Sequence, residues 1–299
     1  MSSIKDFFKK TRVLDGGMGQ ELLNRGVIPH GTIWGATALL YKKYHKLLIN
    51  THLDFIRAGA EVIVTNSFGS RKRRLIENKL GHKFNKLNKL AGKLARDAVN
   101  KSKKKILIAG SLPPQNFTYF ADLGKDLNFI KNNFRAQARC LNPYVDFFYF
   151  DVMCSLKECQ IAINSIRPFK KEFLVGIHIR KGGKLPSGEN LFTVIRKIEK
   201  YEPIGIIVSC VSIEDVNEVI KDFKKIKTPY GFKINAFEHI PAGWKPDSNN
   251  PKVQLGKRND LTPVKFAKTC IKFNKMGANI LGGCCEITPS HIKKLKNLI

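Results

Sequence analysis

The sequence predicts an α/β fold, a (β/α)8 TIM barrel formed as a single domain over residues 1–299. Eight short apolar runs alternate with segments of helical periodicity, which indicates a parallel sheet. Eight such units in about 250–300 residues are typical of a closed barrel. Polar residues follow most of the apolar runs, at the level where the active sites of such barrels lie.

Each predicted strand is a short apolar run bounded by turn-forming residues. Gly16-Gly17 closes the first run, and the seventh is followed by a segment rich in Pro, Gly, Asn and Lys, 239–260, which we expect to be a long loop. The eight predicted strands are 11–15, 61–67, 105–110, 146–151, 173–178, 205–210, 230–235 and 278–281.

The predicted helices carry apolar residues three or four positions apart. His52 lies on the apolar side of the predicted helix 33–58, and we expect it to be a hydrogen-bonded structural histidine. Thr262-Pro263 and Thr288-Pro289 are helix-start signals, with proline near the first helical position. The predicted helices between the strands are 18–25, 33–58, 86–102, 129–141, 155–167, 192–199, 213–223 and 262–276.

The composition indicates a protein with a sizeable core and free thiols. Hydrophobic residues make up 43% of the 299 residues, and the seven cysteines are an odd number at irregular spacing. The first residues are charged and lack the apolar segment of a signal peptide, and no apolar run approaches the ~18 residues that span a membrane. We therefore expect a soluble, cytoplasmic protein with no membrane partner.

The net charge of +29 raises the alternative of a basic protein that binds nucleic acid or an anionic surface. The basic clusters at 71–74, 101–105 and 293–296 are scattered over segments expected to be helix or loop. The sequence contains no zinc-finger spacing and no aromatic RNP pattern. We expect a solvated basic outer face and no nucleic-acid partner, and keep the binding protein as an alternative of a different class.

Polar residues end the predicted strands, and in a barrel these ends form one rim. We take this rim as the site. Candidate catalytic residues are Asp15 and Asp151. The candidate rim residues, given in chain order, are Asp15, Thr65, Asn66, Ser111, Asp151, His178, Cys210, Asn235, Cys284 and Cys285.

Two adjacent cysteines, Cys284 and Cys285, follow the last strand and Gly282-Gly283. A disulfide between them is disfavoured because the peptide plane strains its geometry. They are either two buried thiols or two thiolates on one soft metal, of which Zn²⁺ fits best. A metal needs a third ligand, and Cys210 is the cysteine that ends a strand at the rim.

The other cysteines, Cys140, Cys154, Cys159 and Cys270, are expected to be packing thiols, and His178 a neighbour or core residue rather than a ligand.

Three thiolates on zinc leave a fourth position open and make the metal a weak activator of water. Such a metal binds a substrate thiol well and holds it as a thiolate. The reaction that this favours is alkyl transfer to a thiol.

The chain resembles the homocysteine S-methyltransferase family. The resemblance lies in runs that occur in order along the chain, of which the Gly-Gly-Cys-Cys ending with an upstream cysteine is the most specific. The runs are Asp15-Gly16-Gly17-Met18-Gly19-Gln20-Glu21-Leu22, Thr65-Asn66-Ser67-Phe68, Ala109-Gly110-Ser111, Cys210, Asn235 and Gly282-Gly283-Cys284-Cys285.

The resemblance implies a barrel with Zn²⁺ on Cys210, Cys284 and Cys285 and with homocysteine as the thiol acceptor, giving methionine. It implies that the amino acid end of the acceptor is held by Asp15-Gly16-Gly17, by Thr65 and by Asp151. We add Asn66, Ser111 and Asn235 as substrate-binding candidates. The family usually has Glu at the position of Asp151 and Asn at that of Ser209. Because Asp is one methylene shorter than Glu, we expect its contact with the substrate ammonium to need a water or a shifted loop.

The partners expected are small molecules, homocysteine and an activated methyl donor with a sulfonium or quaternary ammonium group. Alternatives are a different thiol acceptor or a partner protein carrying methylcobalamin, and association into a homo-oligomer is left open. Aromatic residues near the rim, Trp34, Phe68, Phe237 and Trp244, are candidates to line a cation-binding pocket, with ordinary packing as the alternative.

Overall fold

Eight parallel strands form the centre of the protein in a computed structural model, which describes residues 4–245 and 250–299. They are β1 (Arg12–Val13), β2 (Val62–Val64), β3 (Leu107–Leu112), β4 (Phe147–Met153), β5 (Phe173–Ile177), β6 (Gly205–Val211), β7 (Tyr230–Ile234) and β8 (Ile280–Gly283). Their order is β1-β8-β7-β6-β5-β4-β3-β2. A parallel bridge between Leu14 and Val62 joins the two ends, so the sheet closes into a barrel.

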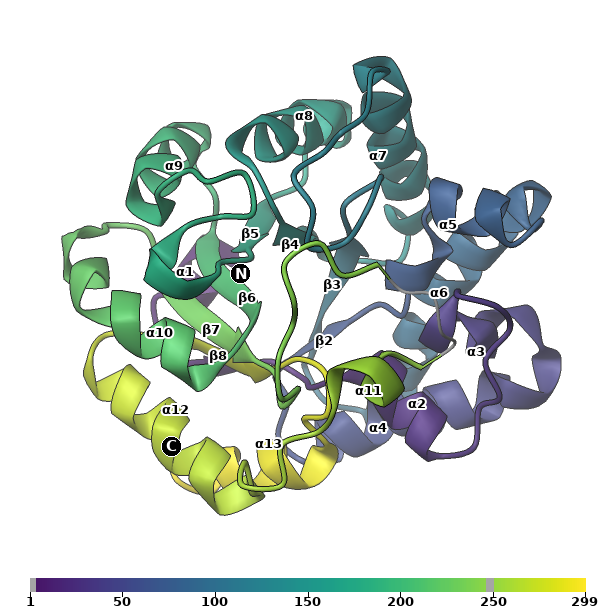
Figure 1. Ribbon diagram of the computed structural model, residues 1–299. Helices are drawn as coiled ribbons and strands as arrows, with labels where there is room; N and C mark the ends of the chain where they lie inside the picture. The colour runs from purple at the N-terminus through teal and green to yellow at the C-terminus, as the bar shows by residue number, and fades with distance from the viewer. Residues whose placement is uncertain (1–3, 246–249) are drawn as a thin grey trace.

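Helices surround the barrel on its outside (Figure 1). Several begin where the sequence predicts, because the side chains of Ser155, Ser212 and Thr262 each accept a hydrogen bond from a backbone N–H of the first turn. The helices are α1 (Ile4–Phe7), α2 (Met18–Asn24), α3 (Thr37–Leu40), α4 (His45–Arg57), α5 (Lys72–Glu77), α6 (Phe84–Ser102), α7 (Leu127–Leu141), α8 (Leu156–Ile166), α9 (Leu191–Ile198), α10 (Ile213–Val219), α11 (Pro251–Leu255), α12 (Pro263–Lys275) and α13 (Pro289–Lys296).

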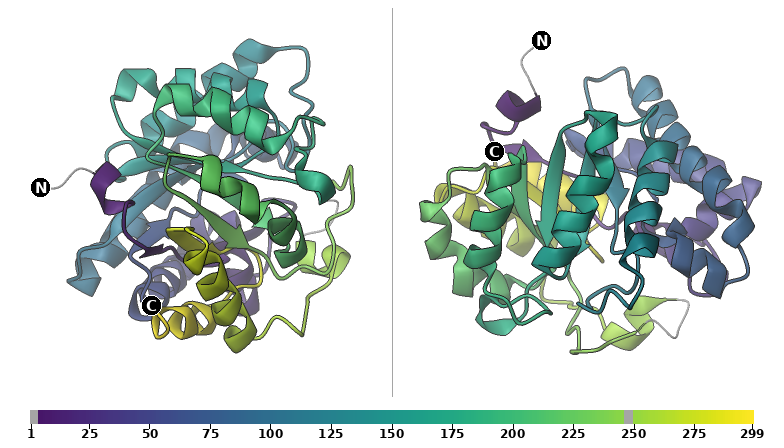
Figure 2. Two further views of the ribbon diagram at one scale, coloured as in Figure 1. Left: turned by 90° about the vertical axis from the view of Figure 1, so that its left-hand side faces the viewer. Right: turned by 90° about the horizontal axis from the view of Figure 1, so that it is seen from above.

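Two apolar layers hold this arrangement together. One lies inside the barrel and includes Leu14, Phe147 and Ile280, and the other fills the space between the strands and the helices. Phe8 follows α1 and packs edge-to-face on Phe147, with ring centroids 5.6 Å apart. Figure 2 shows α1 and α11 at opposite ends of the barrel, so the end beside α11 is free to hold a site.

The predicted barrel is confirmed, and two element predictions are wrong. Residues 33–58 do not form one helix, because Tyr41 is extended (φ −111°, ψ 121°) and Trp34 has a positive φ of 54°. Trp34 packs on Gly19 and donates a hydrogen bond to Gln20, a tertiary contact that helical spacing alone does not reveal. The segment 239–260 contains α11, which starts at Asn250-Pro251; residues 246–249 lie outside the described residues.

His52 is buried as expected but not hydrogen-bonded as expected. Within residues 4–245 and 250–299, neither ring nitrogen has a hydrogen-bond partner. Burial lowers the pKa of His52 to about 3, so the ring is neutral at physiological pH. Among the same described residues, no helix combines the length and apolar character needed to cross a membrane.

Candidate active site

Three cysteine sulfurs converge at the end of the barrel where the strands finish. Cys210 comes from β6, and Cys284 and Cys285 follow β8. Their sulfur atoms all lie within 4.8 Å of one another, and the Sγ atoms of Cys284 and Cys285 are 4.0 Å apart. Cys210 therefore joins a cysteine pair that lies 74 positions further along the chain.

A β-bulge turns Cys210 toward the other two sulfurs. The register between β6 and β7 shifts between Ser209 and Val211, and Cys210 has a φ of +57°. A positive φ is costly for a residue with a side chain and is usually tolerated where function requires it. The bulge thus orients the cysteine at some cost in backbone strain.

The Cys284–Cys285 loop is fixed by backbone hydrogen bonds and by close packing on Gly16-Gly17. The Cys284 N–H donates to Ile234 O at 2.7 Å, and Cys285 O accepts from Ala236 N–H at 2.9 Å. A Cβ on Gly17 would lie 2.5 Å from Cys284 O, closer than real contacts allow. The two glycines of the first loop are therefore needed for the approach of the cysteine loop.

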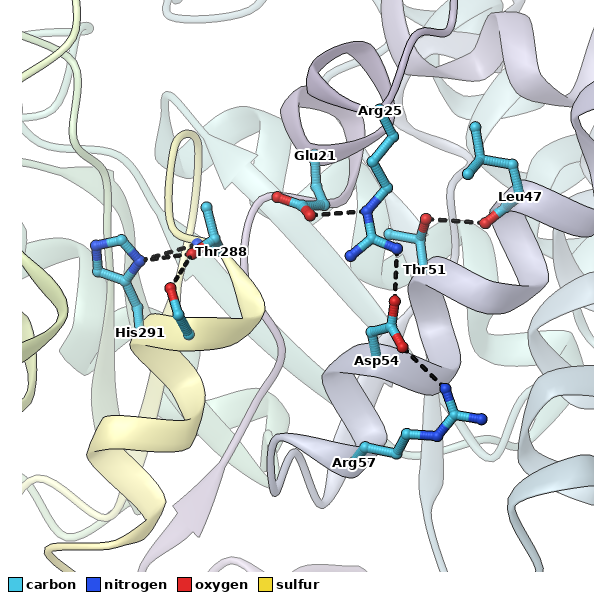
Figure 3. A network of polar contacts seen from close by, with 9 residues as sticks. Glu21, Arg25, Leu47, Thr51, Asp54, Arg57, Thr288 and His291 are labelled. Atoms are coloured by element: carbon cyan, nitrogen blue, oxygen red, sulfur yellow. Dashed lines mark hydrogen bonds and ion pairs between the residues drawn. The ribbon is translucent and has the colours of Figure 1, made fainter.

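Helix α13 continues from this loop, and its start is held by a capping box. The Thr288 N–H donates to Nδ1 of His291 at 3.2 Å (Figure 3). On the other side of the ring, Nε2 of His291 lies 3.0 Å from Leu261 O. In the same view, Arg25 bonds Glu21 on α2 and Asp54 on α4. These contacts anchor the elements behind the cysteine loop.

Two polar side chains contact Cys210 directly. The hydroxyl of Tyr119 lies 3.1 Å from the sulfur, and Nδ2 of Asn235 donates to it at 3.8 Å. Burial alone would raise the pKa of Cys210, but its contacts with Cys284, Cys285 and Tyr119 outweigh burial and hold the pKa well below the usual thiol value. The Tyr119 hydroxyl and the Asn235 amide are therefore placed to stabilise negative charge on the Cys210 sulfur.

The donor set fits a soft metal ion. Three sulfurs within 4.8 Å of one another are a donor set that suits Zn²⁺ and other soft ions. The contact with Cys210 raises the pKa of Cys284 and of Cys285, which a divalent cation would reverse. His178 stays outside the cluster, with Nδ1 3.3 Å from Ser209 O and its ring packed on Tyr119, so it is a neighbour as expected.

A cavity of about 110 Å³ opens beside the sulfurs. The cysteines line it together with most of the predicted substrate-binding residues. Two aromatic residues of its wall, Trp34 and Phe68, pack edge-to-face with centroids 6.1 Å apart. The predicted residues that line the cavity are Gly16, Gly17, Thr65, Asn66, Ser111, Asp151, Cys210, Cys284, Cys285 and the aromatic residues Trp34, Phe68, Phe237 and Trp244.

Two predicted site residues face protein groups instead. Asp15 is fully buried; its Oδ2 accepts from the Val64 N–H at 2.7 Å, and its Oδ1 lies 3.6 Å from Nζ of Lys233. Burial raises the pKa of Asp15 to about 6. Asn235 contacts Cys210 and the Phe237 N–H. Both residues support the walls of the site in this structure.

Asp151 is partly exposed and lines the cavity. A second bulge lies here, because the β4–β5 register shifts between Phe150 and Met153 and Val152 has a φ of +68°. Ser111 donates to Asp151 Oδ2 at 3.3 Å. The bulge orients this carboxylate much as the first orients Cys210.

Lys233 is a cavity residue that the sequence reasoning missed. It lies on β7 with its side chain only 6% exposed, and its ammonium faces Asp15. Burial would lower the pKa of Lys233, but Asp15 and Asp151 reverse the shift and raise it. The sequence did indicate this placement, because Lys233 lies in an apolar strand two residues before Asn235. Residues two positions apart in a strand point to the same face, so Lys233 shares the inward face with Asn235.

Known proteins similar to this chain are homocysteine S-methyltransferases. A sequence model with that description matches residues 12–299. Homocysteine S-methyltransferase 1 of Brassica oleracea var. italica is 25% identical, with 95% of this chain and 91% of its own length aligned. Homocysteine S-methyltransferase of Escherichia coli strain K12 is also 25% identical, over 95% of this chain and 94% of its own.

The fold has a close counterpart among solved structures. The metallated form of the homocysteine methyltransferase MmuM from Escherichia coli matches with a TM-score of 0.80 at 20% identity, over 97% of this chain and 96% of that chain. This match shows the shared barrel. Because the family model extends over nearly the whole sequence, the protein is an enzyme of the homocysteine S-methyltransferase family.

Proposed function

We propose that the protein is a zinc-dependent S-methyltransferase that moves a methyl group from a small activated donor to the thiolate of L-homocysteine, giving L-methionine. One observation carries the proposal: the sulfur of Cys210 meets those of the distant pair Cys284 and Cys285 at the wall of a cavity. Membership of the family supports homocysteine as acceptor.

Cys210, Cys284 and Cys285 would hold the zinc ion. A zinc ion bound by three thiolates supplies a soft positive centre that keeps an acceptor thiol ionised at neutral pH. The chain itself contributes the Tyr119 hydroxyl and the Asn235 amide, which stabilise negative charge on Cys210. All seven cysteines are free thiols, which suits a reducing cytoplasm.

The amino acid end of the acceptor would lie against the opposite charges of Asp151 and Lys233. We assign the acceptor ammonium to Asp151 and its carboxylate to Lys233, because these two charged groups line the same cavity as the sulfurs. Asp15 would act as a positioning residue that holds the Lys233 ammonium in place. Ser111 and Thr65, which hydrogen-bond each other through Ser111 N–H and Thr65 Oγ1 at 3.0 Å, would hold the neighbouring wall.

The transfer requires one bond to form and one to break. The acceptor thiol first loses its proton to solvent, and an electron pair of its sulfur then forms the bond to the methyl carbon. The bond between that carbon and the donor's positive sulfur or nitrogen breaks, and its electron pair stays on the donor, which leaves uncharged at that atom. The chain's contribution is to align both molecules and keep water from the cavity.

The donor would lie against the aromatic wall, where ring faces attract an onium centre. We propose a small sulfonium or quaternary ammonium donor, and a cobalamin-bearing partner protein is the alternative. We also propose that residues 1–299 act as one domain.

Metal content and methyl transfer measured on the same samples test this function. Wild type should contain about one zinc per chain and convert homocysteine to methionine with at least one donor of a sulfonium and quaternary ammonium panel. Cys210→Ala should lose the zinc and at least about 100-fold of the transfer rate. Cys270→Ala is the matched control, because Cys270 is buried on α12 away from the cluster. Zinc and transfer retained in Cys210→Ala would overturn the proposal.

A further inference from the structure

A buried glutamine links the aromatic wall of the cavity to the cysteine loop. Gln20 lies on α2 and is 0% exposed. Its side-chain oxygen accepts a hydrogen bond from the indole N–H of Trp34, which lines the cavity. Its amide nitrogen donates to Oε1 of Glu286 at 2.6 Å, and Glu286 directly follows Cys285 in the chain. One side chain therefore connects two parts of the site.

The partners of Gln20 leave its amide only one orientation. An indole nitrogen only donates hydrogen bonds and an ionised carboxylate only accepts them, so the amide oxygen must face Trp34 and the amide nitrogen must face Glu286. The same nitrogen donates to Oδ1 of Asn250 at 3.2 Å. Asn250 caps α11, whose first residue, Pro251, lines the cavity. Helices α2 and α11 thus lie side by side (Figure 1).

Both residues that Gln20 joins have a backbone conformation that residues other than glycine rarely adopt. Trp34 has a φ of +54° and Glu286 has a φ of +63°. Such strain persists where surrounding contacts fix it, and it gathers at functional sites. Lys257 adds to these contacts, because its Nζ lies 3.3 Å from Oε2 of Glu286. The strain at both ends of the link points to a role beyond ordinary packing.

The hydrogen bond of Trp34 is better protected than that of the other tryptophan in the cavity wall. A Cβ on Gly19 would lie 2.6 Å from the Trp34 ring, so the ring packs directly on the backbone of α2. Trp244 also donates to a glutamine, Gln254, at 3.1 Å, but this bond is exposed and water can replace it. The acceptor of Trp34 is buried, where water is excluded.

We propose that Gln20 is a positioning residue for methyl transfer. Held by Glu286, it keeps the indole of Trp34 at a fixed place relative to the sulfurs of the cysteine loop. This inference rests on the proposed function, in which the donor lies against the aromatic wall. Transfer needs the acceptor sulfur and the methyl carbon aligned and in contact, so a displaced wall slows the reaction. Gln20 thus acts on the donor side and leaves homocysteine binding unchanged.

Gln20→Met tests this role, because methionine keeps the length of glutamine and removes its acceptor and its donors. The donor probes are S-methylmethionine, a sulfonium, and betaine, a quaternary ammonium. The kcat/KM for the donor should fall by about 10-fold or more. The KM for homocysteine and the zinc content should stay within about 2-fold of wild type. Gln254→Met is the matched control and should keep the wild-type values, because its bond is exposed.

The fluorescence emission of Trp34 gives a readout that a general loss of stability would not move. The chain has two tryptophans, so Trp244→Phe leaves Trp34 as the only indole. In that background, Gln20→Met should shift the emission maximum and raise the acrylamide quenching constant by about 2-fold or more, because the indole N–H has lost its acceptor. Gln254→Met should leave both quantities unchanged.

A reciprocal exchange tests the bond between positions 20 and 286. Gln20→Glu alone places two carboxylates at the 2.6 Å contact, and should lower the donor kcat/KM at least as much as Gln20→Met. Adding Glu286→Gln returns an amide donor to that contact and leaves the indole its acceptor. The double variant should therefore recover about 5-fold or more of the loss. If Gln20→Met does not fold, this comparison decides.

The outcomes separate the two proposals. An unchanged donor kcat/KM in Gln20→Met would overturn the positioning role, even with a lower unfolding temperature, as would a loss of transfer with the Trp34 emission unchanged. An equal loss in Gln20→Glu and in the double variant would also count against it decisively. If wild type transfers no methyl group to homocysteine from any donor, the proposed function fails, while the emission of Trp34 still decides whether Gln20 holds the indole.

Discussion

Lys233→Met is the substitution that tests acceptor recognition most sharply. Methionine keeps the length and apolar stem of lysine but removes the ammonium that lies 3.6 Å from Asp15. The site then keeps Asp151 for the acceptor's ammonium and loses the cation assigned to its carboxylate. Burial raises the pKa of Asp15 to about 6, and the Lys233 ammonium partly opposes this rise. Without the ammonium, Asp15 should therefore take up a proton at higher pH than in wild type.

The expected loss follows from the strength of one hydrogen bond between charged groups. Such a bond contributes about 1.5–3 kcal/mol, which corresponds to about a 10- to 150-fold decrease in kcat/KM for homocysteine. The change should appear mainly in KM, because Lys233 is assigned to binding and not to the breaking bond. Initial rates would be compared with those for 3-aminopropane-1-thiol, which is homocysteine without its carboxylate.

Wild type should prefer homocysteine over the aminothiol, and Lys233→Met should accept both with similar efficiency. Lys296→Met is a matched control, because Lys296 forms an ion pair with Glu61 at 3.2 Å on α13 and does not line the cavity. A Lys233→Met enzyme that still distinguishes the two thiols as wild type does would refute the assignment of the acceptor carboxylate.

Three further predictions follow from single contacts. Gly17→Ala should lower zinc content, measured by elemental analysis, because its Cβ would meet Cys284 O at 2.5 Å; normal zinc content would show that the loop adapts. Asp151→Asn should raise the KM for homocysteine about 10-fold or more, since a neutral amide cannot pair with the acceptor ammonium, and an unchanged KM would remove Asp151 from the site. His52→Leu should make the free energy of unfolding less sensitive to acid. The pKa of His52 is lowered to about 3 in the folded protein, so the stability that the neutral ring contributes is present above pH 6.5 and is lost as pH falls. The loss should be about 2 kcal/mol at pH 5 relative to neutral pH. Urea unfolding at pH 7 and pH 5 measures this loss, and an equal loss in wild type and variant would contradict it.

The sequence was sufficient to predict the barrel fold and the meeting of the three cysteines. Strand ends in a parallel barrel meet at one rim, so Cys210 and the Cys284–Cys285 pair could be brought together without coordinates. The glycine pairs beside them could be recognised as places of close approach. The residues that these glycines contact could not be predicted, because the approach of Gly17 to Cys284 depends on how two distant loops pack.

Features that depend on local backbone strain escaped prediction. The bulges at Cys210 and Val152 leave no pattern in a run of apolar residues, yet they decide where a sulfur and a carboxylate point. Tyr119 comes from the loop after β3, which has no periodicity to read. The break of the predicted helix 33–58 has the same cause, since the contacts of Trp34 override its helical spacing.

X-ray absorption at the zinc edge of the purified protein counts the atoms around the metal, and so tests whether three cysteines hold it with one position open for the acceptor. We expect three sulfur neighbours at about 2.3 Å without acceptor and four in the presence of homocysteine. A sulfur count that stays at three when homocysteine is bound, or a metal surrounded mainly by nitrogen and oxygen, would contradict it.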